Sequence, residues 1–213
     1  MSKDFFDVII LGSGPAGFYS AVNCAGRGFS VLVIEPDEPG GTGFRWGALP
    51  VKAGLDLIRN YSGGDPAQAF AAVIAGASGA SDRIKSGLSK AGAVLLRGTP
   101  EILSPRQVRV IPEGTETSAV GFSCRYLVIA AGTSPAAPEG FVLIGTDFIS
   151  HRELLFRDEL PRRLDIVGGN VEGIELAYLY AGLGVPVTVT EMEKDILPGT
   201  DPELTAPLKD RME

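Results

Sequence analysis

The chain has 213 residues, of which 45% are hydrophobic and 21% charged, and its formal net charge is -7 at pH 7. This length suits one or two domains of a soluble globular protein, and an acidic chain without a basic cluster is a poor candidate for binding nucleic acid or an anionic membrane. No apolar run approaches the roughly 18 residues of a membrane span, and no signal peptide is recognisable, so we expect a reduced, cytoplasmic protein. The cysteines lack metal-ligand spacing, so we expect no bound metal.

The first predicted elements form a βαβ unit. Phe5–Leu11 is a short, β-branched apolar run, which is typical of a buried parallel strand. A glycine-rich turn follows, and residues 16–27 then predict a helix that Gly28 ends. Residues 30–34 predict a second buried strand, which ends at Glu35.

The middle of the chain predicts helices and a small antiparallel meander. In the longer of the two helices, Gly76, Gly79 and Gly87 lower the helix propensity. A polar turn is expected over residues 113–118, between two strands of the meander. We expect a loop over residues 36–46, helices over 48–61 and 65–91, and strands over 93–96, 101–103, 107–111 and 120–123.

The last part of the chain predicts a second nucleotide-binding opening. Residues 125–131 read as another buried strand, and residues 136–140 are a candidate linker. A second βαβ unit then follows, with a strand over 164–167, a glycine-rich turn, a helix to about residue 183, and a strand over 187–190 that ends at Glu191. The chain is therefore predicted to be an α/β protein with a tandem Rossmann-like arrangement and a small antiparallel meander.

The first glycine motif, Gly12-Ser13-Gly14-Pro15-Ala16-Gly17, lies between a predicted strand and a predicted helix, with an acid about twenty residues further on. At this spacing Gly12 allows the tight turn, Gly14 lets the backbone approach a pyrophosphate, and Gly17 allows close packing of helix and strand. The helix N-terminus offers free N–H groups to the phosphates, and Glu35 would accept a hydrogen bond from a ribose hydroxyl. The alternative is a glycine-rich turn without a ligand.

The segment from Gly40 to Lys52, GGTGFRWGALPVK, resembles the active-site stretch of the pyridine nucleotide-disulfide oxidoreductases, such as dihydrolipoamide dehydrogenase, glutathione reductase and mercuric reductase. The resemblance covers nearly the whole chain, because both glycine motifs and Ala131-Gly132-Thr133 occur in the family's order. It implies a fold that binds FAD and NAD(P). Trp46-Gly47 also resembles the soluble pyridine nucleotide transhydrogenases, which do not use the two-cysteine relay.

The chain departs from this family at its redox-active cysteine pair. The resemblance places that pair at Gly43 and Ala48, neither of which forms a disulfide. Cys24 and Cys124 lie elsewhere and are more simply small buried hydrophobes. The dithiol–disulfide relay therefore cannot run in this chain.

Other family positions are retained. By resemblance, Thr42 lies near the FAD phosphates, Lys52 lies near the reactive edge of the flavin, and Glu175 pairs with Lys52. Such a lysine can stabilise reduced flavin electrostatically; the alternative is a surface lysine and an unrelated glutamate. The FAD contacts that we expect outside the first glycine motif are Glu35, Pro36, Gly41, Thr42, Lys52, Thr99, Ala131, Gly132 and Thr133.

The second motif, Gly168-Gly169-Asn170-Val171-Glu172-Gly173, resembles the family's NAD(P)H site. Asn170 replaces a glycine, and asparagine tolerates positive φ, so the turn is expected to survive. Glu172 suits the helix dipole but would repel a pyrophosphate that it faced. Glu191 would accept from a ribose 2′-OH and repel a 2′-phosphate, which predicts NAD(H) over NADP(H). The alternative is a retained fold that no longer binds nucleotide.

We expect an FAD-binding domain over residues 1–150 and an incomplete NAD(P)H-binding domain over 151–213. The resemblance implies a homodimeric family with a C-terminal dimerisation domain, which this sequence lacks, so the chain is either truncated or naturally short. The sole histidine, His151, matches no catalytic position and is expected at the surface or at a helix start.

Three functions follow from these patterns. The first is an FAD-dependent NADH oxidoreductase that passes electrons to a non-thiol acceptor of unknown identity. The second is a non-catalytic or truncated FAD-binding protein or subunit. The third, a disulfide reductase that uses a thiol from elsewhere, has the least support.

Overall fold

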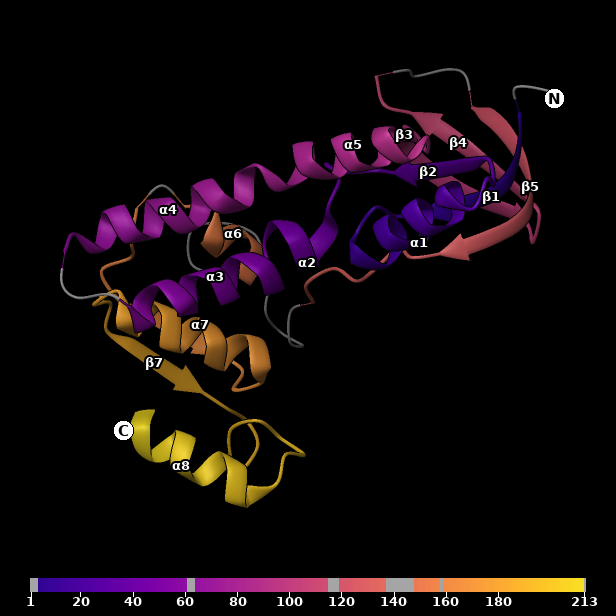
Figure 1. Cartoon of the computed structure of the whole chain (residues 1–213). Coiled ribbons are helices and arrows are strands. Elements are labelled where there is room, and N and C mark those ends of the chain that lie inside the picture. The colour runs from indigo at the N-terminus through magenta and orange to yellow at the C-terminus, as the bar shows by residue number, and fades with distance from the viewer. Residues whose placement is uncertain (1–3, 61–63, 115–118, 137–147, 158, 213) are drawn as a thin grey trace. The chain divides into compact units, whose positions relative to one another are not determined.

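The computed structural model describes residues 4–60, 64–114, 119–136, 148–157 and 159–212. The chain divides into two compact units (Figure 1). The first unit comprises Met1–Arg45 and Ala77–Ser134, and the second comprises Trp46–Gly76 and Pro135–Glu213.

The first unit is built on one sheet of five strands in the order β1-β2-β3-β4-β5, in which β5 also pairs with β1 and closes the sheet on itself. The β1–β2, β2–β3 and β1–β5 pairs are parallel, whereas β3–β4 and β4–β5 are antiparallel. The strands are β1 (Phe5–Leu11), β2 (Val31–Glu35), β3 (Val94–Ser104), β4 (Gln107–Pro112) and β5 (Val120–Ile129).

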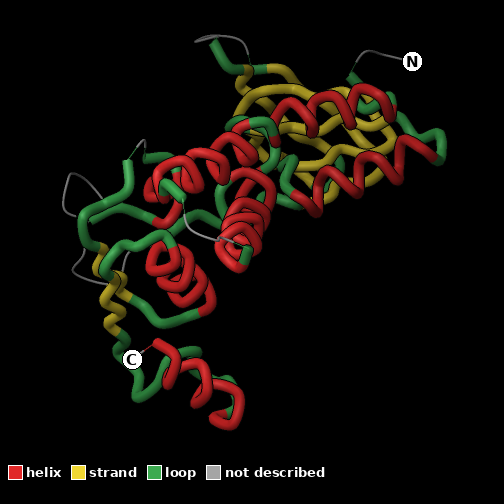
Figure 2. The backbone as a smooth tube through the Cα atoms, turned by 60° about the vertical axis from the view of Figure 1, so that its left-hand side comes forward, coloured by secondary structure: helices red, strands yellow, loops and turns green. Residues whose placement is uncertain are grey.

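Alternate side chains of β1 and β2 enter two different cores, as the period of a strand requires. On one face, Val8 and Val33 pack with residues of α1 (Pro15–Gly26) and α5 (Ala80–Ala91). On the other face, Ile9 and Ile34 pack against the inner residues of β4 and β5. Figure 2 shows these helices beside the strands of this unit. A short helix, α2 (Gly41–Arg45), completes the unit.

The second unit has a small parallel sheet, β6 (Leu164–Val167) and β7 (Val187–Thr190), joined by α7 (Val171–Gly182). Its core contains Trp46, Leu179 and Tyr180, and the Tyr180 hydroxyl donates to the Leu154 carbonyl oxygen at 3.2 Å. The other helices of this unit are α3 (Ala48–Arg59), α6 (His151–Leu155) and α8 (Pro202–Met212), and α4 (Pro66–Ser78) runs from the second unit into the first.

The predicted α/β fold with its antiparallel meander is confirmed, but several element boundaries were wrong. Residues 36–46 contain α2 and are not only a loop, and the single helix expected over 65–91 is two helices that meet at Gly79, the N-cap of α5. Glycine disfavours a continuous helix at this point. The helix α8 was not predicted. Only part of the expected linker over residues 136–140 and of the polar turn over 113–118 lies among the described residues.

Two strands run further than expected because each exchanges one partner for another without a break. In β3, the parallel pairing with β2 ends at Arg97, and the antiparallel pairing with β4 begins at Gly98. In β5, Ser123 pairs with both β4 and β1. The expected domain boundary at residue 150 differs from the division into two units, which assigns no cofactor to either, so that boundary stays a prediction.

Candidate cofactor-binding site

The first glycine turn connects β1 to α1, and two of its glycines have no room for a side chain. Gly12 has φ +101, and a Cβ there would overlap the carbonyl group of Ala130. A Cβ at Gly17 would overlap the carbonyl group of Gly12. Only glycine lets the helix and the strand approach so closely, as the sequence predicted.

Glu35 lies at the carboxyl end of β2, and its side chain is only 7% exposed. One carboxylate oxygen accepts from the Ser13 backbone N–H at 2.8 Å and from the Ser13 hydroxyl at 2.6 Å. The other oxygen accepts from the Asp37 N–H at 3.0 Å. Glu35 therefore holds the turn in place, and its contact with a ribose stays a prediction.

The N-terminus of α1 is open for an anion. Gly14 is the N-cap and supplies no side-chain hydrogen bond, Pro15 follows, and the first turn carries no acidic residue. A helix start of this kind has unsatisfied N–H groups and a positive dipole end, which suit a phosphate. The residues present therefore fit the pyrophosphate of a dinucleotide.

The segment of α2 packs against this same turn. Gly41 has φ +55, and a Cβ there would lie 3.1 Å from the Gly14 Cα. The Gly40 N–H donates to the Ser13 hydroxyl at 3.3 Å. Thr42, a predicted phosphate contact, follows directly on α2. The structure thus brings Gly41 and Thr42 next to the first glycine turn.

The position of the first lost cysteine is also at this turn. A Cβ at Gly43 would lie 2.5 Å from Pro15 Cγ, which is too close for an unstrained contact. Position 43, where the resemblance places the family's first redox cysteine, is therefore a glycine without room for a side chain. Ala48, the second position, is exposed at the start of α3.

The other predicted FAD contacts lie near the carboxyl ends of parallel strands, where ligands bind in folds of this type. Ala131, Gly132 and Thr133 follow β5, which lies beside β1, and Gly132 has φ +68. Pro36 follows β2 and is exposed. Thr99 lies on β3, two residues after Arg97, which pairs with Glu35 across the β2–β3 ladder.

In the second unit, the structure brings the predicted pair of α3 and α7 together. Lys52 Nζ donates to Glu175 Oε1 at 2.7 Å. The lysine side chain is 64% exposed and the glutamate side chain 26% exposed, so solvent screens the pair and its contribution to stability is small. The lysine charge is accessible to solvent, and its role beside a flavin stays a prediction.

The second glycine turn repeats the first in most of its backbone. Gly168 has φ +111, and a Cβ at Gly173 would overlap the Gly168 carbonyl group. Glu191, at the end of β7, accepts from the Gly169 N–H at 2.6 Å and from the Glu193 N–H at 2.9 Å. The hydrogen bonds from Glu193 and Gly169 lower the pKa of Glu191 below its ordinary value.

Asn170 departs from its expected role in this turn. It was expected to tolerate a positive φ, but its φ is -74, so no such tolerance is needed. Instead it is the N-cap of α7, and its side-chain oxygen accepts from the Gly173 N–H at 3.0 Å. Val171 and Glu172 follow and are exposed.

The sequence did not indicate the surroundings of Trp46. This side chain is 5% exposed and lies in the core of the second unit. The ring of His151, the first residue of α6, lies 5.1 Å from it, and the Arg152 guanidinium lies 5.6 Å from its centroid. His151 is thus at a helix start, as predicted, but its contact with Trp46 was missed because it joins distant parts of the sequence.

Both cysteines are free, and of the two expected buried positions only Cys124 is buried. Cys124 is buried, and its burial raises the pKa of its thiol, whereas Cys24 is half-buried on α1. A raised thiol pKa disfavours the reactive thiolate. Within the described part of the chain, no group of three or more His, Cys, Asp or Glu side chains could hold a metal ion. None of the described helices is long and apolar enough to cross a bilayer.

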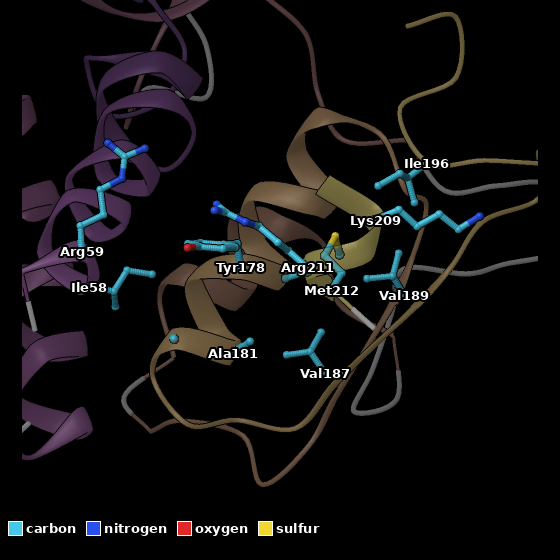
Figure 3. Close-up of a pocket in the computed structure, with 12 residues that line it drawn as sticks. Ile58, Arg59, Tyr178, Ala181, Val187, Val189, Ile196, Lys209, Arg211 and Met212 are labelled. Atoms are coloured by element: carbon cyan, nitrogen blue, oxygen red, sulfur yellow. The ribbon is translucent and has the colours of Figure 1, made fainter. Parts of the chain in front are cut away.

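A cavity of about 530 Å³ lies within the second unit, between α3, α7, β7 and α8 (Figure 3). Most of its lining residues are apolar, three are basic, and none is a predicted site residue. The Lys209 amine is paired with Asp195 at 2.6 Å. The cavity therefore does not coincide with the predicted cofactor site.

Comparisons with known proteins match almost the whole chain to one family. The family model described as pyridine nucleotide-disulphide oxidoreductase matches residues 6–213. Dihydrolipoyl dehydrogenase 2 of Haloarcula marismortui is 31% identical over 97% of this chain and 47% of its own length. The dihydrolipoyl dehydrogenase of Pseudomonas aeruginosa is 32% identical over 94% of this chain and 47% of its own length.

Among solved structures, the Cu(II) complex of the HOCl-induced flavoprotein disulfide reductase RclA from Escherichia coli has a TM-score of 0.87 at 23% identity. The match covers 98% of this chain and 47% of that chain. This likeness is one of fold. The chain spans about half the length of the curated relatives that it matches.

Proposed function

The chain belongs to the pyridine nucleotide-disulphide oxidoreductase family, and we propose that it forms the cofactor-binding part of an FAD-dependent NADH oxidoreductase that passes electrons to a non-thiol acceptor. The chemistry that bound FAD would supply is acceptance of a hydride from NADH and release of its two electrons to a quinone, a dye, oxygen or a second nicotinamide. NADH becomes NAD⁺ in this exchange, and the acceptor is reduced.

The observation that carries this proposal is the Lys52–Glu175 pair, kept at 2.7 Å in a chain that has lost the redox cysteines. Glu175 orients an accessible positive charge, and such a charge can stabilise negative charge that develops on a cofactor. The open N-terminus of α1, Glu35 and the α2 segment support FAD binding at the first turn. Glu191 supports a preference for NADH over NADPH.

The hydrogen bond by which the Asn170 side chain caps α7 favours a second candidate function. If Asn170 and Glu172 exclude the nicotinamide dinucleotide, the chain is a non-catalytic FAD-binding protein or subunit. The two candidates share the flavin and differ in whether NADH reduces it.

The test combines an absorption spectrum with anaerobic stopped-flow mixing. Purified protein is expected to show bound flavin, and NADH is expected to bleach its visible band. Lys52→Gln and Glu175→Gln are expected to retain the flavin and to slow bleaching at least about ten-fold, because they remove or misplace the charge. Lys90→Gln, an exposed lysine on α5, is the matched control and should bleach at the parent rate.

The outcomes separate the candidates. A yellow protein that neither NADH nor NADPH bleaches would support the non-catalytic candidate. A colourless protein that does not take up added FAD would overturn both. Equal bleaching rates in Lys52→Gln and in the parent would remove the role assigned to the pair.

A further inference from the structure

The two glycine turns have the same backbone at the position where a pyrophosphate approaches. Gly14 has φ -63 and ψ -177, and Asn170 has φ -74 and ψ -174. Each is the N-cap of the helix that follows. The two turns therefore differ at this position in the side chain and not in the path of the chain.

That side chain occupies part of the helix start in the second turn. The Asn170 oxygen accepts from the Gly173 N–H at 3.0 Å, whereas α1 has no side-chain cap at all. A capping oxygen and a phosphate oxygen compete for the same kind of donor, the free N–H groups of a first helical turn. In the first turn, no side chain projects from the cap, and a Cβ at Gly14 would make only ordinary contacts, the nearest at 3.9 Å with the Gly41 Cα.

The charge at the two helix starts also differs, and like the cap it disfavours a phosphate at the second turn. The first turn of α7 carries Glu172, which is exposed, and the first turn of α1 carries no acid. An acid at this place already satisfies the helix dipole, and it repels an incoming diphosphate. The cap and the charge thus both oppose a dinucleotide at the second turn.

We propose that Asn170 is a specificity-determining residue that, with Glu172, lowers the affinity of the second turn for the pyrophosphate of NAD(H). This inference rests on the proposed NADH oxidoreductase function. Before the pyrophosphate can reach the helix start, the Asn170 side chain has to release the Gly173 N–H. The first turn has no such residue, so the chain binds its two dinucleotides at intrinsically unequal sites.

The test measures NAD⁺ binding to the FAD-loaded protein by calorimetry, because NAD⁺ does not reduce the flavin. Asn170→Gly is expected to bind NAD⁺ about ten-fold more tightly, and Asn170→Asp several-fold more weakly, because aspartate keeps the cap and adds a negative charge. Glu172→Gln should tighten binding by a smaller factor that shrinks as salt is added.

A purely structural role for Asn170 makes the opposite prediction, since loss of the cap would fray α7 and weaken binding in Asn170→Gly. Ser150→Gly removes the cap of α6 and is the matched control, with no expected change in NAD⁺ affinity. If Asn170→Gly binds NAD⁺ no more tightly than the parent, this inference is overturned and the proposed function stands. If NAD⁺ binds to no variant and NADH bleaches no flavin, the proposed function is overturned as well.

Discussion

The glycine turns after β1 and after β6 are built from the same parts and have different surroundings. In each, the first glycine N–H donates to the strand end that precedes the acid, Gly12 to Ile34 and Gly168 to Thr190, both at 2.8 Å. In each, the acid accepts from the next backbone N–H. The same glycine spacing and the same terminal acid therefore accompany the same hydrogen bonds in both turns.

The neighbours of the turns decide what else can fit there. A Cβ at Gly12 would meet Ala130 after β5, whereas a Cβ at Gly168 would have nothing within 4 Å. The second turn is instead contacted by the loop after β7, where the Leu197 N–H donates to the Gly169 carbonyl at 2.7 Å. Leu197 has φ +52, a strained conformation for a leucine. The motif predicts the turn, and the neighbours determine its capacity for a ligand.

The largest expected effect breaks one turn and leaves the other intact. Gly17→Ala would place a methyl group on the Gly12 carbonyl and is expected to cost about 3 kcal/mol and the bound flavin. Gly173→Ala creates the same clash with Gly168 and is expected to abolish NAD⁺ binding while the protein stays yellow. Absorption spectra, urea unfolding and NAD⁺ titration measure these effects. A yellow Gly17→Ala protein would show that the flavin is not held by the first turn.

The next effect concerns the packing around Pro15 and Val171, the residues that follow the two N-caps. Gly43 packs on Pro15. Gly43→Ala gains about 1 kcal/mol of helix propensity but forces a methyl group against Pro15, a clash that costs about 1–3 kcal/mol, so net destabilisation is expected. Val171, the counterpart of Pro15, is 58% exposed, and Val171→Ala should lie within about 0.5 kcal/mol of the parent. Urea unfolding followed by circular dichroism measures both. Equal stabilities would mean that α2 does not pack on the first turn as described.

An effect of similar size is expected from the two acids, and the difference between them is smaller. Glu35→Gln places an amide NH2 group against either the Ser13 donors or the Asp37 N–H inside a buried site, which should cost about 1–2 kcal/mol and weaken FAD retention. Glu191→Gln makes the same change in a more exposed place and should destabilise the protein less. Thermal unfolding and flavin release by dialysis measure the difference. A reversed order would contradict the role of burial in this comparison.

Some features of the fold and of the candidate site could be predicted from the sequence, and others could not. Strand patterns and glycine spacing predicted both turns, and the family resemblance predicted the Lys52–Glu175 pair across a long separation. The contact of Trp46 with His151 and the packing of Gly43 on Pro15 could not be predicted, because they depend on tertiary neighbours. The cap at Asn170 agrees with the preference of asparagine for N-cap positions, and the expected tolerance of positive φ was not needed because an N-cap residue has an extended backbone.

The smallest expected effect is the pH dependence of the second turn. The N–H groups of Glu193 and Gly169 lower the pKa of Glu191 in the folded protein. A lowered carboxyl pKa contributes stability above the unfolded pKa, which is near 4.5, and that contribution is lost as the pH falls through the folded pKa. The stability difference between the parent and Glu191→Gln should therefore be constant near neutral pH and shrink below about pH 4.5. Urea unfolding from pH 7 to pH 3.5 measures this difference, with Glu203→Gln on α8 as the exposed control. A stability difference that grows in acid would mean that the turn does not stabilise the carboxylate of Glu191. Glu191 and Glu35 would then be alike only in the backbone around them.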